Sequence, residues 1–232
     1  MTQPTRVVLR STVLHRGAAW VLHPVVILLQ HFRIDPNWVT GFSVVFALGV
    51  GKALWDGSWW TAALFLAANG ICDVVDGELA RSLDALGSRK MHLKQMGYIL
   101  DGLTDRVADL FIFAGLIMRT VRMYPADTLE ERTLIFGLVI ALGSHIISSY
   151  LRATLEKHGH TLRKQQRPLT RAGFHVAVAT VCLCTRYVQY DELEVFYWTN
   201  LSTVCALTVF VLVKRMIEAY GIFSAMDRTP DK

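Results

Sequence analysis

Four aspartates stand in or beside stretches of this chain that are otherwise apolar enough to cross a lipid bilayer. They are Asp73, Asp76, Asp101 and Asp105. An ionised carboxylate at the centre of a bilayer costs roughly 2.5–3.5 kcal/mol or more on insertion scales, so a chain that keeps four of them is expected to give them a cation. This pattern argues against a passive membrane anchor and favours a metal-dependent enzyme of the membrane.

The spacing of these aspartates is helical. Two sets of residues recur at intervals of three or four: Asp73, Asp76, Gly77, Ala80 and Arg81 in the first, and Gly97, Asp101 and Asp105 in the second. Each set therefore lies on one face of a helix, and two such helices facing each other would bring the four carboxylates together. Carboxylate oxygens suit hard divalent cations such as Mg²⁺ or Mn²⁺. Two such ions beside a phosphate are the usual arrangement for displacing a phosphoryl group.

The composition predicts an all-α integral membrane protein rather than a soluble domain. Hydrophobic residues make up 53% of the 232 residues. Apolar runs near the ~20 residues that cross a bilayer predict six transmembrane helices. They lie at about 38–55, 58–75, 98–118, 133–151, 173–190 and 197–214. An amphipathic helix in the membrane interface is expected within 1–35, with a seventh span there as the alternative.

The distribution of basic residues predicts the orientation in the membrane. Three quarters of the Lys and Arg residues fall in four segments, 1–37, 76–97, 152–172 and 214–232. This bias places both termini and the acidic motif on the cytoplasmic side. The net charge of +5 then reflects topology and anionic lipid, and we expect no nucleic-acid partner. The whole chain, 1–232, is predicted to be one domain, with a juxtamembrane helix in 1–35, a bundle over 36–215 and a cytoplasmic tail over 216–232.

The residues around the aspartates resemble the signature of the CDP-alcohol phosphatidyltransferase family (class I). The family pattern is D-x2-D-G-x2-A-R, a spacer, and G-x3-D-x3-D, and its eight defining residues all occur between Asp73 and Asp105. Asn37-Trp38-Val39-Thr40 is similar to the family's entry into its first transmembrane helix. The spacer, residues 82–96, is longer than usual by about seven residues, close to two helical turns. An extension of either helix would absorb them in phase, and a loop bulging at Gly87 is the alternative.

The resemblance implies an enzyme of phospholipid synthesis. It would move a phosphatidyl group from CDP-diacylglycerol to the hydroxyl of a small alcohol and release CMP. The four aspartates would hold two ions, Mg²⁺ or Mn²⁺, and Asp105 would also act as the base that a hydroxyl nucleophile needs within hydrogen-bond reach. The CDP-lipid would contact Asn37, Thr40, Asp73, Gly77, Ala80, Arg81 and Ser88. A homodimer is also implied, and for Asn37 and Thr40 plain helix capping is the alternative.

The choice of acceptor alcohol depends on a second resemblance. The run D-x3-D-R-x2-D from Asp101 to Asp109 resembles the phosphatidylinositol-phosphate-synthase-like branch, which uses inositol phosphate, so a polyol with or without its own phosphate is expected. Three arginines could bind such a phosphate or could be ordinary positive-inside charges. They are Arg152, Arg167 and Arg171.

Two further residues near the motif have bland interpretations. Asp109 continues the face of the second aspartate pair, so it either supports the site or pairs with Arg106. His145 is expected to be packed or hydrogen-bonded rather than catalytic.

Other functions stay open from sequence. In a cation transporter or exchanger the carboxylates would line an ion path, but the acids gather at one end of the predicted spans and no internal repeat is visible. An inactive scaffold would be suggested by a missing aspartate, and none is missing. A related CDP-lipid phosphohydrolase, in which water replaces the alcohol, is not separated from the transferase by sequence.

Overall fold

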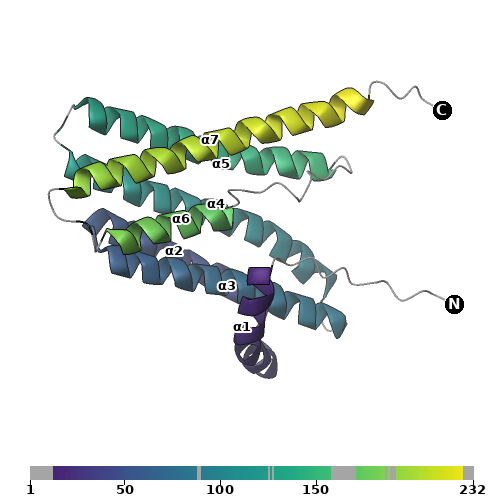
Figure 1. Cartoon of the computed structure of the whole chain (residues 1–232). Coiled ribbons are helices and arrows are strands. Elements are labelled where there is room, and N and C mark those ends of the chain that lie inside the picture. The colour runs from purple at the N-terminus through teal and green to yellow at the C-terminus, as the bar shows by residue number, and fades with distance from the viewer. Residues whose placement is uncertain are drawn as a thin grey trace. The chain divides into compact units, whose positions relative to one another are not determined.

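The computed structural model describes residues 13–87, 90–124, 126, 128–157, 171–185, 188 and 192–226. Over these residues the chain forms seven α-helices and no strand (Figure 1). Their bounds are α1 Val13–His31, α2 Pro36–Asp56, α3 Trp59–Ala85, α4 Met91–Met123, α5 Leu129–Lys157, α6 Arg171–Cys184 and α7 Leu193–Met226. The all-α prediction is confirmed for this part of the chain.

Three segments among the described residues are long and apolar enough to cross a membrane. They are Pro36–Asp56, Leu129–Leu155 and Leu193–Ile222. Helices α3 and α4 are long, with 27 and 33 residues, but the charged residues of the acidic motif interrupt their apolar stretches. Helix α6 has 14 residues, fewer than the ~20 that cross a bilayer, and the predicted span 173–190 continues into residues outside the described ones. Three candidate spans are therefore observed, and six remain a prediction.

The surface of the described helices is rich in large apolar side chains. Trp38 on α2, Phe136 on α5 and Ile217 on α7 are all more than 60% exposed. Soluble monomers rarely expose contiguous apolar patches larger than a few hundred Å², because contact of apolar surface with water is unfavourable. Exposed apolar side chains on several long helices are what contact with lipid requires.

Two compact units divide the chain, and the division cuts through helices. The first comprises the chain up to Ser43 together with Asn69–Thr104, and the second comprises Val44–Ala68 and the chain from Asp105 onward. Helices α2, α3 and α4 each contribute to both units. In the first unit α1 packs on α3, where Val26, Val75 and Leu79 are buried together.

The second unit contains the larger core, and α5 and α7 lie side by side in it (Figure 1). Helices α2 and α4 approach closely here: a Cβ on Gly115 would lie 2.4 Å from the carbonyl oxygen of Gly51. Neither backbone can yield easily, so the contact requires glycine. Close approach of this kind through small residues is typical of helix packing in membranes.

The helices extend further than their apolar runs predict. Helix α3 continues to Ala85 and α4 begins at Met91, so most of the long spacer 82–96 is helical. Gly87, with φ at +63°, makes the turn after α3. The extension hypothesis accounts for most of the extra length, and the turn at Gly87 accounts for part of the rest.

Helix α7 continues past the predicted end of the bundle at residue 215. Helix α7 continues to Met226, whereas the sequence places a tail from residue 216. The helical extension has tertiary partners: Arg215 donates a hydrogen bond to the hydroxyl of Ser148 on α5, and Ala219 is buried. The C-terminal part of α7 is therefore held against α5 at Arg215.

Candidate functional site

Helices α3 and α4 bring carboxylates of the two motif halves together. In the first unit, a carboxylate oxygen of Asp73 lies within 4.8 Å of one of Asp101. Asp105 follows Asp101 one turn later on α4. Asp73 and Asp101 are exposed and Asp105 is half-buried. The helical spacing predicted from the sequence therefore yields carboxylates that are close together and open to ligands.

Asp76, the fourth predicted metal ligand, has a different environment. It is 9% exposed, and its Oδ2 accepts a hydrogen bond of 2.6 Å from the hydroxyl of Thr40, which is itself buried. Asp76 is not among the carboxylates whose oxygens lie close enough together to hold one ion. A role for Asp76 as a ligand stays a prediction.

The entry of α2 is tied to both motif helices within the first unit. Asp35 caps α2, because its Oδ1 accepts a 2.8 Å hydrogen bond from the backbone N–H of Asn37. The side chain of Asn37 donates to the backbone oxygen of Leu93 on α4 at 3.3 Å. Capping is thus performed by Asp35, and the two residues singled out in the sequence, Asn37 and Thr40, contact α4 and α3 instead. Contact of either with a nucleotide stays a prediction.

The remaining residues of the first motif half lie along α3. Arg81 is exposed and pairs with Glu78 at 2.8 Å. A Cβ on Gly77 would lie 3.5 Å from the guanidinium of Arg81, an ordinary contact distance. Packing among the described residues therefore does not require glycine here. Ala80 is half-buried, and Ser88 lies outside the described residues.

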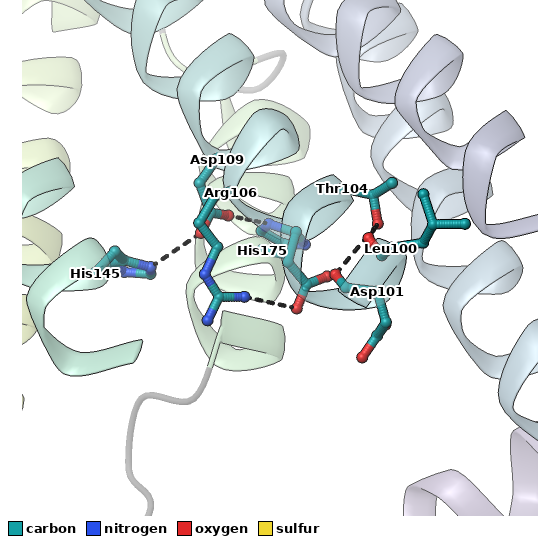
Figure 2. A network of polar contacts seen from close by, with 8 residues as sticks. Leu100, Asp101, Thr104, Arg106, Asp109, His145 and His175 are labelled. Atoms are coloured by element: carbon teal, nitrogen blue, oxygen red, sulfur yellow. Dashed lines mark hydrogen bonds and ion pairs between the residues drawn. The ribbon is translucent and has the colours of Figure 1, made fainter. Parts of the chain in front are cut away.

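On α4 the charges of the motif are paired in the second unit (Figure 2). Arg106 donates to Oδ2 of Asp105 at 3.3 Å. Asp109 faces two histidines: Nδ1 of His145 lies 3.6 Å from Oδ2, and Nε2 of His175 lies 3.4 Å from Oδ1. Asp109 thus contacts a histidine on each of two other helices, and whether it also pairs with Arg106 or supports the site stays a prediction.

The packing of His145 is as the sequence predicts. Its ring meets those of Phe113 and Phe174 edge-on, with centroids 5.7 and 4.8 Å away. The partner His175 was missed in the sequence, since no local pattern connects it to Asp109. The one signal for His175 in the sequence was its position on a predicted span that has few other polar residues.

Three arginines are predicted to bind the phosphate of the acceptor, and the structure describes the side chain of one of them. Arg152 is exposed on α5. Arg171 is the first residue of α6, and its side chain lies outside the described part. Arg167 also lies outside the described residues. Their role in binding the acceptor stays a prediction.

A family model for CDP-alcohol phosphatidyltransferase matches residues 33–213. This chain belongs to that family. The match covers both halves of the acidic motif and all three candidate spans except the last residues of the third. The family predicted from the motif is confirmed, and family membership together with the long apolar helices indicates an integral membrane protein.

Two curated relatives match part of the chain. An archaetidylinositol phosphate synthase from Methanothermobacter thermautotrophicus is 34% identical over 121 residues, 52% of this chain and 52% of its own. A phosphatidylinositol phosphate synthase from Mycobacteroides abscessus is 32% identical over 149 residues, 61% of this chain and 59% of its own. The chain thus matches less than two thirds of the length of either relative.

Solved structures share the fold. The phosphatidylinositol phosphate synthase of Mycobacterium tuberculosis with CDP-DAG bound has a TM-score of 0.66 and 23% identity, covering 87% of this chain and 94% of that one. The same protein in complex with manganese and citrate has a TM-score of 0.64, covering 85% and 88%. At this identity the likeness establishes a common helical membrane fold.

Proposed function

We propose that this chain is an enzyme of phospholipid synthesis that transfers a phosphatidyl group from CDP-diacylglycerol to a hydroxyl of a phosphorylated polyol, with release of CMP. One observation carries the proposal: the complete eight-residue motif is present, and its carboxylates from α3 and α4 lie close together. The names of the two curated relatives, an archaetidylinositol phosphate synthase and a phosphatidylinositol phosphate synthase, support inositol phosphate as the acceptor. The CDP-DAG bound to the solved relative supports the donor.

The donor set fits a divalent cation. Asp73 and Asp101 offer carboxylate oxygens within 4.8 Å of each other, Asp105 follows one turn later on α4, and oxygen-only ligands suit Mg²⁺ or Mn²⁺. We expect these three aspartates and Asp76 to hold two ions, and the manganese complex of the solved relative supports the choice of metal. When bound, the ions would neutralise the pyrophosphate and the leaving CMP.

Asp105 is proposed as the base. Its carboxylate would accept the proton of the attacking hydroxyl, and Arg106 donates to Oδ2 of the same carboxylate at 3.3 Å. The hydroxyl oxygen then forms its bond to the phosphorus that carries the lipid. The bond from this phosphorus to the bridging oxygen of CMP breaks, and CMP leaves with the electron pair.

Arg81 and Gly77 are proposed to bind the pyrophosphate of the donor. The pair between Arg81 and Glu78 is exposed, and such surface pairs contribute only about 0–1 kcal/mol. A phosphate that accepts two hydrogen bonds from one guanidinium competes well with it. Gly77 leaves room beside the guanidinium, so a phosphate can approach the α3 backbone there.

The orientation and assembly are also proposals. We propose that the protein spans the membrane several times with the site facing the cytoplasm, which the distribution of Lys and Arg supports. We propose a homodimer on the basis of the family resemblance. Arg152, Arg167 and Arg171 are proposed to bind the phosphate of the acceptor.

The test is CMP release by the purified protein in detergent with CDP-diacylglycerol and Mg²⁺ or Mn²⁺. The acceptors are inositol phosphate, glycerol phosphate, serine, inositol and none, and the lipid product is identified by mass. We expect release with inositol phosphate that is lost in Asp105→Asn and kept in Asp84→Asn. Asp84 is a matched control, because it is an exposed carboxylate of α3 outside the motif that pairs with Lys94 at 3.2 Å.

Each of the other possible results of this assay would indicate a different function. Release without any acceptor, with phosphatidic acid as product, would establish a phosphohydrolase. Release with a different acceptor would move the chain to another branch of the family. No release under any condition would refute the proposed reaction.

A further inference from the structure

The buried group of Asp109, His145 and His175, here called the Asp109 cluster, is not used by the proposed reaction and needs an explanation. Asp109 is 5% exposed, and the side chains of both histidines are 12% exposed. A buried carboxylate is costly unless it is paired. Each of its oxygens faces one histidine, at 3.6 and 3.4 Å. The carboxylate of Asp109 is therefore in polar contact with both imidazole rings.

The surroundings of the cluster are aromatic. Phe113 and Phe174 stack with their centroids 4.9 Å apart and planes 10° from parallel. His145 meets both rings edge-on. In such an apolar setting of low dielectric constant, polar contacts are stronger than in water. The cluster is therefore a specific connection of α4 to α5 and α6 rather than a set of solvated charges.

The position of the cluster on α4 gives it a consequence for the site. Asp109 lies one turn beyond Asp105 on the same face of the helix. Side-chain atoms lie roughly 5–6 Å from a helix axis, so a rotation of about 10° displaces them by about 1 Å. A misplacement of about 1 Å in a reacting group can cost about 100-fold in rate. A connection of α4 to two other helices, one turn from Asp105, is thus well placed to set the rotation of α4.

We propose that the Asp109 cluster is a positioning device: by binding α4 to α5 and α6, it holds Asp105 where it can take the proton of the acceptor hydroxyl. This inference rests on the proposed function for its chemistry, although the connection between the helices does not. Asp109, His145 and His175 are positioning residues, because none of them needs to touch a substrate.

The experiment compares Asp109→Asn with a control variant that removes a different buried contact of α4. Tyr197 on α7 is fully buried, and its hydroxyl donates to the backbone oxygen of Leu116 on α4 at 3.2 Å. Tyr197→Phe therefore removes a buried connection to α4 that lies several turns from Asp105. We expect Asp109→Asn to lower kcat by about 10- to 100-fold with little change in KM for CDP-diacylglycerol, and Tyr197→Phe to keep kcat per folded molecule.

Conservative variants separate positioning from loss of folding. The amide of Asn places an N–H near the position of Nδ1, and that of Gln near Nε2. His145→Asn and His175→Gln can therefore keep the contacts with Asp109, whereas His145→Leu and His175→Leu cannot. We expect each amide variant to recover a large part of the kcat that the matching leucine variant loses.

A second readout does not depend on activity. Amide hydrogen exchange followed by mass spectrometry should show faster exchange in the α4 segment 101–109 in Asp109→Asn than in Tyr197→Phe. Equal exchange and equal kcat in the two variants would overturn the positioning proposal. A wild-type protein without CMP release would refute the proposed function alone, since the exchange comparison would still report on the cluster.

Discussion

Replacing Thr40 by valine tests how the buried carboxylate of the motif is held. The two side chains are nearly equal in size, so the change removes the hydroxyl and little else. That hydroxyl lies 2.6 Å from Oδ2 of Asp76 and 3.2 Å from the backbone oxygen of Pro36. It has one proton for two acceptors, and the shorter distance to a carboxylate assigns that proton to Asp76.

The magnitude follows from the burial of both partners. Thr40 is 6% and Asp76 is 9% exposed, so water does not readily replace the lost donor. A hydrogen bond to a charged group contributes about 1.5–3 kcal/mol. If Asp76 acts in the reaction, this corresponds to a loss in kcat/KM of about 10- to 150-fold, at about 1.4 kcal/mol for each factor of ten.

The assay is CMP release as a function of Mn²⁺ concentration. We expect Thr40→Val to lose activity by that factor and to need more Mn²⁺ for half-maximal rate, while Thr40→Ser keeps the hydroxyl and stays near wild type. Ser43→Ala is the matched control, because the hydroxyl of Ser43 is buried one turn away and donates to the Thr40 backbone oxygen at 2.7 Å. Equal activity and equal Mn²⁺ dependence in Thr40→Val and Thr40→Ser would refute the reasoning.

Two further predictions concern packing and metal binding. Gly115→Ala should lower stability by about 1–3 kcal/mol through overpacking, since the added Cβ would lie 2.4 Å from the Gly51 backbone oxygen. Gly143→Ala, where nothing lies within 4 Å of the added Cβ, should be neutral or stabilising; thermal unfolding in detergent measures both, and equal midpoints would contradict the close approach. Asp73→Ala should weaken Mn²⁺ binding, measured by titration of the purified protein, and an unchanged affinity would exclude Asp73 as a ligand.

The features that the sequence predicted best are those that depend on residues close together in the chain. The intervals of three and four residues between the aspartates predict one helical face without knowledge of any contact, because helical periodicity depends only on the backbone. The approach of Asp73 to Asp101 followed from two such faces joined by a short turn. The family was likewise predictable, because its signature lies within a single stretch of the chain.

The ends of the helices depended on partners distant in sequence. Apolar runs predict where a helix crosses lipid and do not report how far it continues into water. Helix α7 extends to Met226 with Arg215 bound to Ser148 of α5, and α3 extends to Ala85 with Ser82 bound to Gln30 of α1. Such contacts stabilise helical turns that lie beyond the ends of the predicted spans.

By itself, the sequence indicated a helical membrane protein with carboxylates on two helical faces, because these properties follow from hydropathy and residue spacing, and the resemblance of its motif indicated the family. Only the tertiary structure decided the partners of the buried polar groups. Thr40 donates to Asp76, and Asp109 lies between His145 and His175, across separations that no periodic pattern encodes. The physical reason is that a buried polar group must find its partner among whatever the packed helices place beside it.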